Sequence, residues 1–145
     1  MNRRTKHYFA SFFLAAVMTA ALSFQAFAAR IAFSDPTGNV GDEIAVTMKI
    51  TSTGNETINS SDVMLSYDSS ALEFLSGTGA TGGAGCIRVV GSADSQDSKE
   101  LQFTLKFRAL KAGNSKISIS TQEVYDKDSQ TVNIDREGSA SVTIQ

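Results

Sequence analysis

The residue types that most often carry catalysis are scarce in this sequence, and their positions limit the chemistry it could perform. His7 is the only histidine and Cys86 the only cysteine. Because His7 lies in an N-terminal segment that we expect to be removed, neither a Ser-His nor a Cys-His nucleophile pair can be assembled in the remaining chain. The same scarcity excludes the usual His and Cys ligand sets for zinc or copper.

The 15 acidic residues are the other candidates for chemistry. Glycoside hydrolysis needs two carboxylates about 5 to 10 Å apart across a sugar site, yet these acids lie in turns or on polar strand faces. Asp126, Asp128 and Asp135 could suggest a calcium site, but the segment 126–130 lacks the glycine and the later acid of an EF-hand loop. We therefore expect a protein that is not an enzyme and that holds neither a metal nor a cofactor.

A glycine-rich segment, residues 76–85, reads S-G-T-G-A-T-G-G-A-G. It differs from a phosphate-binding loop because no lysine follows at the required spacing and no helix is expected after it to supply amide donors. We interpret it as a mobile connection between two strands.

The first 28 residues have the three-part layout of a secretory signal peptide. Arg3, Arg4 and Lys6 precede an apolar stretch, which closes with the small residues Ala26 and Ala28. An uncleaved anchor is the alternative, but polar residues leave an apolar run that is short for a span of roughly 20 residues. The segment holds three of the 13 basic residues and none of the acidic ones, so residues 29–145 carry a net charge of −5. This acidity disfavours nucleic acid or an anionic membrane as a partner.

The rest of the chain is dominated by period-two alternation of apolar and polar residues. Apolar positions alternate along 43–50, 62–67 and 100–108, and shorter apolar runs lie between turn sequences. About nine short strands at this spacing predict an all-β fold, a two-sheet antiparallel β-sandwich or jelly roll, over residues 29–145. Cys86 cannot form an internal disulfide, so we expect it either to be buried or to be free to pair with another chain.

Three segments, in order along the chain, resemble those of cohesin domains. They are V-G-D-E-I-A-V at 40–46, D-V-M-L-S-Y-D at 62–68, and L-K-F-R-A at 105–109 followed by Ala112-Gly113. The resemblance extends over nearly all of residues 30–145. Cohesins are β-sandwiches, related to carbohydrate-binding modules, that bind dockerins in extracellular polysaccharide-degrading assemblies such as cellulosomes. The resemblance therefore implies an exported receptor whose partner is a dockerin-containing protein.

The family binds dockerins on a flat sheet face that includes outward residues of the Tyr-Asp strand. The resemblance places Asp62 at an acidic contact position of that strand, with Met64 and Ser66 on the same face. Ser60 stands where many cohesins have Asn, and residues 76–98 are shorter and richer in glycine than the corresponding part of the family. It also implies that calcium belongs to the dockerin and that this chain needs none.

Two other binding roles remain open at this stage. A carbohydrate-binding module of this fold class would stack sugar rings on exposed aromatic residues, but the chain has no Trp. Phe103 and Phe107 fall on the apolar side of their strand, which leaves Tyr125 and Phe33 as candidates. A structural or adhesive module of a larger surface protein is the other alternative, because a sandwich needs no ligand to fold.

Overall fold

The computed structural model describes residues 28–145, and the predicted signal peptide therefore lies almost entirely outside the described residues. Eleven strands follow one another without a helix in this part of the chain. They are β1 (Ala28–Phe33), β2 (Thr37–Gly38), β3 (Glu43–Ser52), β4 (Ser60–Ser66), β5 (Leu72–Gly77), β6 (Ala80–Gly83), β7 (Cys86–Ser92), β8 (Glu100–Ala109), β9 (Gly113–Tyr125), β10 (Asn133–Glu137) and β11 (Ala140–Ile144). Residues 28–145 thus contain no helix that could cross a membrane.

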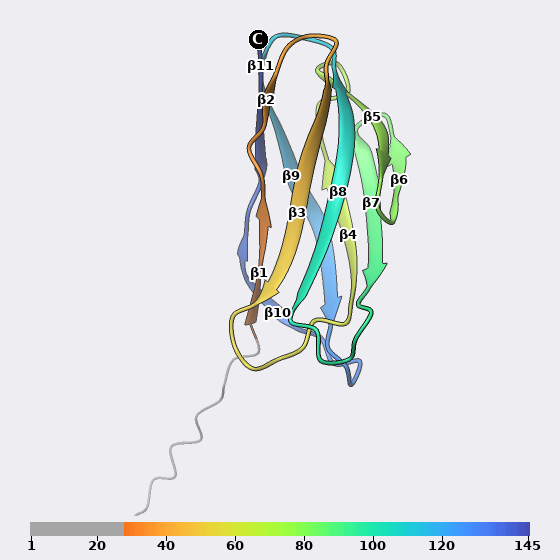
Figure 1. Ribbon diagram of the computed structural model, residues 1–145, viewed down its shortest axis with the longest axis vertical. Helices are drawn as coiled ribbons and strands as arrows, with labels where there is room; N and C mark the ends of the chain where they lie inside the picture. Colours follow the sequence, from red (N-terminus) through yellow and green to blue (C-terminus); the bar gives the residue numbers. More distant parts are fainter. Residues whose placement is uncertain (1–27) are drawn as a thin grey trace, which may run out of the picture.

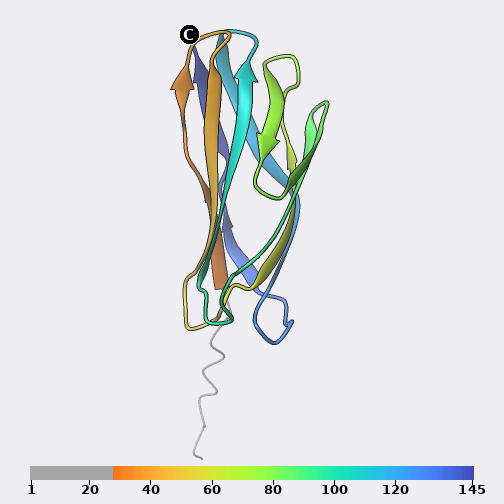
Figure 2. The ribbon, with the colours of Figure 1, turned by 45° about the vertical axis from the view of Figure 1, so that its right-hand side comes forward.

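The strands form two stacked sheets, which confirms the predicted sandwich (Figure 1). One sheet has five strands in the order β10-β1-β3-β8-β5, and the other has six in the order β2-β11-β9-β4-β7-β6. Figure 2 shows β3 and β8 in one layer and β9 behind them in the other. The strands missing from the prediction are β2 and β6, which have only two and four residues.

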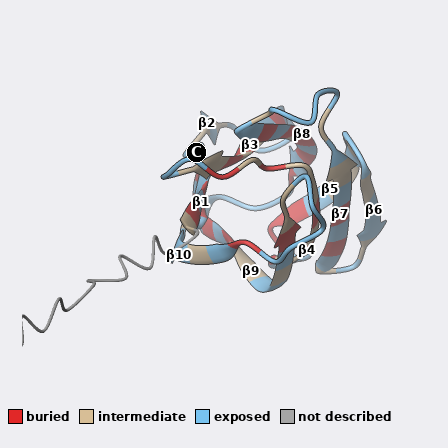
Figure 3. Ribbon diagram, turned by 90° about the horizontal axis from the view of Figure 1, so that it is seen from below, coloured by how far each residue is buried: buried red, intermediate tan, exposed pale blue. Residues whose placement is uncertain are grey.

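The core lies between the two sheets, as the alternation predicts. In β3 the buried positions are Ile44, Val46, Met48 and Ile50, and in β8 they are Leu101, Phe103, Leu105, Phe107 and Ala109. Buried and exposed positions alternate along the strands in both layers when the molecule is viewed along its axis (Figure 3). Phe107 is fully buried and makes edge-to-face contacts with the rings of Tyr67 and Phe74, at centroid distances of 5.3 and 5.7 Å.

Two strand pairs differ from the all-antiparallel arrangement that the sequence predicts. β1 pairs in parallel with β10, and β11 pairs in parallel with β2, each at the margin of a sheet. In each pair the edge strand reaches its sheet by crossing from the other one. β10 follows β9 of the six-stranded sheet, and β2 follows β1 of the five-stranded sheet, so neither is joined to its partner by a hairpin. Both sheets are therefore mixed, although all the central pairs are antiparallel.

The interpretation of residues 76–85 as a mobile connection is wrong. The segment completes β5, forms β6 and turns directly into β7, so both sheets use it. Its glycines permit close packing: a Cβ on Gly79 would collide with the carbonyl oxygen of Val90, and one on Gly82 with the carbonyl oxygen of Cys86. Both residues also have positive φ angles, which glycine adopts without strain. The expected connection is therefore an ordered hairpin, β6–β7, at the edge of the six-stranded sheet.

The two sheets approach each other closely at Gly91 of β7. This glycine faces the core opposite Phe103 of β8, and the phenyl ring occupies the space that a Cβ would need. Below this point neither β5 nor β6 continues, so β7 and β8 are edge strands there and a groove of about 540 Å³ opens between the sheets. The groove adjoins the outer face considered next, and Val90 and Ser92 belong to both.

Candidate functional site

The four site residues predicted from the sequence all lie on the outer side of β4, near the middle of the six-stranded sheet. Ser60, Asp62, Met64 and Ser66 are half-buried, and they alternate with the buried residues Ser61, Val63 and Leu65. Their strand is flanked by β9 on one side and β7 on the other. The structure thus places the predicted residues on one face, with neighbours that the sequence analysis did not include.

Strand register arranges these neighbours in four rows across β9, β4 and β7. In that order, the rows are Tyr125-Ser60-Ser92, Glu123-Asp62-Val90, Thr121-Met64-Arg88 and Ser118-Ser66-Cys86. We call these twelve residues the β9–β4–β7 face. A β-bulge in β9, between the partners of Met64 and Leu65, keeps Thr121 and Glu123 on the outer side. The face is therefore a flat surface of mostly small polar side chains.

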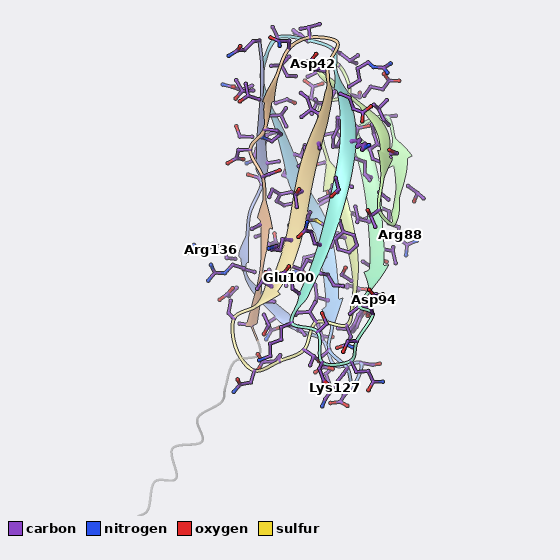
Figure 4. The ribbon with its side chains drawn as sticks, viewed as in Figure 1. Asp42, Arg88, Asp94, Glu100, Lys127 and Arg136 are labelled. Atoms are coloured by element: carbon purple, nitrogen blue, oxygen red, sulfur yellow. The ribbon has the colours of Figure 1, made fainter. Side chains whose placement is uncertain are left out.

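Arg88 is the most important residue that the sequence analysis missed. Its Nε donates to Asp62 Oδ1 and Oδ2 at 3.0 and 3.2 Å, and its Nη2 donates to Oδ2 at 2.6 Å. These hydrogen bonds to Arg88 lower the pKa of Asp62 below its ordinary value of 3.8. Arg88 extends from β7 at the side of the molecule seen in Figure 4. Asp62 is therefore already paired within the chain.

A second polar pair occupies β9. The hydroxyl of Tyr125 donates to Glu123 Oε2 at 3.0 Å, and the nearby carboxylate of Glu123 raises the pKa of Tyr125 above its usual value of 10.0. Glu123 lies directly opposite Asp62 in the register, so two carboxylates face each other across the strands. Like charges in this position repel, and Arg88 compensates for only one of them.

A shallow depression of about 360 Å³ lies over the centre of this face. Its lining residues are Asp62, Met64, Arg88, Thr121, Gln122 and Glu123. Beside it, Val90 is a large apolar residue that is 45% exposed. An apolar spot of Met64 and Val90 within a polar and charged surround is the usual composition of a protein interface.

The outer face of the five-stranded sheet offers a contrast. Its charges form three ion pairs between neighbouring strands, which join Lys49 to Glu100, Lys106 to Glu43, and Arg108 to Glu73 at 3.3 to 3.8 Å. The exposed charges of β3, β5 and β8 named here therefore have partners within the sheet, whereas Arg30 on β1 lies opposite Arg136 in the register and has no such ion pair among the described residues. The β9–β4–β7 face differs from it by having a large exposed apolar residue, Val90, on one of its strands.

The acidic turn at 126–130 serves its own backbone. Asp126 Oδ1 accepts hydrogen bonds from the amides of Asp128 and Gln130, both at 2.9 Å. Within residues 28–145 no group of three or more acidic, His or Cys side chains is placed to hold a metal ion.

Cys86 is exposed at the start of β7, so the interpretation of this cysteine as a buried residue is wrong. Ile87 and Val89 take the inward positions of the strand, and alternation places Cys86 outward beside Ser66. The alternative prediction, a thiol accessible to another chain, is compatible with this position.

Comparison with solved structures identifies the architecture. The structure superposes on the sixth cohesin of scaffoldin B from Acetivibrio cellulolyticus, in complex with a Cel5 dockerin mutant, with a TM-score of 0.71 and 18% identity over 81% of this chain and 99% of that one. The chain has the cohesin fold. The cohesin of the Coh-OlpA-Doc918 complex from Clostridium thermocellum gives a TM-score of 0.68 at 17% identity, again over 81% and 99% of the two chains.

A third cohesin widens the comparison beyond cellulosomes. The non-cellulosomal cohesin from the archaeon Archaeoglobus fulgidus gives a TM-score of 0.66 at 22% identity, over 81% of this chain and 91% of that one. By contrast, no family model and no curated protein matches this sequence. The superpositions confirm the cohesin fold that the sequence resemblance predicts. Because the identities are low, the role of each residue has to be argued from the geometry.

Proposed function

We propose that this chain is an exported, non-catalytic receptor module that binds a dockerin-bearing protein on its β9–β4–β7 face. The observation that carries the proposal is the cohesin fold, which spans 81% of the chain and matches cohesins whose structures were solved with dockerins bound. The sequence resemblance independently assigns the docking strand to residues 62–68, and these residues begin within β4.

The composition of the face supports its use as a docking surface. Met64 and Val90 supply exposed apolar area at the centre, while small Ser and Thr side chains around them leave the sheet flat. An apolar centre with a polar rim gains affinity from desolvation and gains orientation from hydrogen bonds. On the opposite face, six charged residues of β3, β5 and β8 are engaged in three ion pairs, which a partner would have to break before it could pair with them.

The same proposal assigns calcium to the dockerin and no cofactor or catalytic group to this chain. Asp62 is already held by Arg88, and among residues 28–145 no three acidic, His or Cys side chains are placed together to hold a metal ion. Without a histidine beyond position 7, the chain offers no general base of the commonest kind. Its role would be to hold a partner in place.

The setting that we propose is outside the cell, because the N-terminal segment has the layout of a signal peptide. An extracellular polysaccharide-degrading assembly is the setting that the cellulosomal relatives suggest. The non-cellulosomal cohesin of the archaeon shows that the fold also occurs elsewhere. A module within a larger surface protein would use the same face. The proposal therefore specifies the class of partner, a dockerin-bearing protein, and does not depend on the kind of assembly to which the chain belongs.

A capture experiment tests this function. The whole chain is immobilised and exposed to secreted proteins of the source organism with calcium, and bound proteins are eluted with a chelator. We expect a dockerin-bearing protein in the eluate, and we expect Met64→Ala to weaken its binding by about tenfold, the typical effect of truncating a central interface residue. Lys49→Ala, on the opposite face, is the matched control and should bind normally. If no calcium-dependent partner is captured, the receptor function is wrong.

A further inference from the structure

The orientation of Arg88 leaves part of its guanidinium free. The Nε and Nη2 atoms are bound to Asp62, while Nη1 makes no hydrogen bond or ion pair with any residue from 28 to 145. The side chain is 58% exposed, although the three hydrogen bonds fix its direction. A guanidinium held by one edge presents its other edge as a fork of N–H donors, which matches the geometry of a carboxylate. Arg88 is thus oriented in advance for an acidic group from outside.

Glu123 lies on β9, on the other side of β4 from Arg88, and carries the opposite charge. One of its oxygens accepts from Tyr125, and no basic side chain of residues 28–145 lies within ion-pair distance of it. Its charge therefore lacks the compensation that Arg88 gives to Asp62. A cation from a partner would remove the repulsion between Glu123 and Asp62 and would gain an ion pair at the same time.

The spacing between these two groups follows from the sheet. β9 and β7 flank β4, so the strands that carry Glu123 and Arg88 lie two strand spacings, about 10 Å, apart. Met64 lies between them on β4, directly opposite Arg88 in the register. The depression that these three residues line is open to solvent and has room for side chains from a partner.

We propose that Arg88 and Glu123 determine which partner this face accepts. The partner would place a carboxylate against Arg88 and a cationic group against Glu123, about 10 Å apart, with an apolar side chain over Met64 between them. The inference rests on the proposed dockerin-binding function and adds the chemistry that distinguishes one dockerin from another. Asp62 then acts as a positioning residue, because it holds Arg88 in place and its own oxygens already accept hydrogen bonds.

Charge pairs of this kind affect specificity more than they affect total affinity. A partner with a cation over Arg88 or an acid over Glu123 would meet a like charge at each position, and such contacts exclude wrong partners. The order of charges across β9, β4 and β7 is negative, negative and positive, so a partner docked in the reverse direction would also be disfavoured. The face therefore selects both the partner and its orientation.

The test is a selection from a displayed library. The probe is the dockerin of the scaffoldin B complex named above, with its solvent-exposed positions randomised, and the bait is the whole chain in the presence of calcium. We expect the binders selected on the wild-type chain to carry an acidic residue at one position and a basic residue at another position of the same surface. Arg88→Glu should weaken these binders at least about tenfold. The double variant Arg88→Glu with Glu123→Arg should select binders with the two charges exchanged.

A further variant keeps the test informative if the charge reversal disturbs folding, and a second one serves as the control. Arg88→Gln removes the charge without placing a second acid beside Asp62, and it should weaken the same binders in the same direction. Arg108→Glu, a charge reversal on the opposite face, is the matched control and should leave them unchanged.

The outcomes separate the two proposals. Calcium-dependent binders without the charge pattern, or binders indifferent to Arg88→Gln, would overturn this inference and leave the dockerin-binding function intact. A library that yields no calcium-dependent binder at all would contradict the function itself, and the inference would fall with it.

Discussion

Gly91→Ala is a small change at the closest approach of the two sheets, and its effect can be worked out from the structure. The added Cβ would lie 2.6 Å from Cζ of Phe103 and closer still to Cε1, whereas ordinary carbon contacts begin near 3.4 Å. The ring of Phe103, which also lines the groove at this point, must therefore shift by nearly an ångström, and overpacking of this kind typically costs about 1 to 3 kcal/mol. Gly91 does not have the positive φ that would strain an alanine, so the substitution also restricts the unfolded chain and stabilises by about 0.4 to 1 kcal/mol.

The steric cost outweighs the gain from the backbone over most of these ranges, and we expect a net loss of about 1 kcal/mol in the free energy of unfolding. Urea unfolding followed by far-UV circular dichroism measures this loss, because the chain has no Trp to report by fluorescence. The neighbouring outward substitution Ser92→Ala is the matched control and should change stability by less than about 0.5 kcal/mol.

A double-mutant cycle tests the cause. Phe103→Leu shortens the side chain that the new methyl group meets, so Gly91→Ala should be close to neutral, or slightly stabilising, in the Phe103→Leu background. The coupling free energy should then be about 1 kcal/mol or more, with the double variant more stable than the sum of the single changes. Equal costs in both backgrounds would refute the reasoning, because they would show that the loss does not come from this contact.

Three other predictions follow from the outer face. Arg88 lowers the pKa of Asp62 below 3.8, so their pairing contributes fully to stability above that pH and is lost as the pH falls through the folded-state value. The difference in stability between wild type and Arg88→Ala, measured by urea unfolding, should therefore shrink in acid. Glu123→Gln should lower the pKa of Tyr125 toward 10.0, which ultraviolet titration of the phenol would detect, and an unchanged value would contradict the assigned hydrogen bond. Cys86 should react with a thiol reagent in the folded protein nearly as fast as in urea, and strong protection would contradict its exposure.

The regular part of the fold could be predicted because one local rule governs it. In β3 and β8 every second residue is apolar and meets the core, so alternation alone indicates both the strands and their buried sides. The same rule could have placed Cys86, since Ile87 and Val89 fix the inward positions of β7. The prediction of burial rested on residue type instead, because a cysteine without a disulfide partner commonly packs as a small apolar residue.

Other features depend on distances that the sequence does not contain. The glycines at 79 and 82 are required by backbone atoms of β7 that approach them, and composition alone cannot distinguish such packing from mobility. Arg88 could be placed on an outer face by alternation, but its pairing with Asp62 depends on the register between β4 and β7. The parallel pairing of β1 with β10 joins segments about a hundred residues apart, and no local pattern indicates it.

The parallel margins of the two sheets also determine how the molecule would carry a mechanical load. β1 begins at Ala28 at the lower end of the view in Figure 1, and β11 ends at Ile144 at the upper end, so both strands run along the long axis. Tension between these two residues would act along β1 and along the strands that flank it, β3 and β10. The hydrogen bonds of each ladder would then be loaded together in shear, whereas peeling a strand from its end breaks them one after another. This arrangement of the terminal strands favours a high rupture force along the line that joins the two ends of the domain.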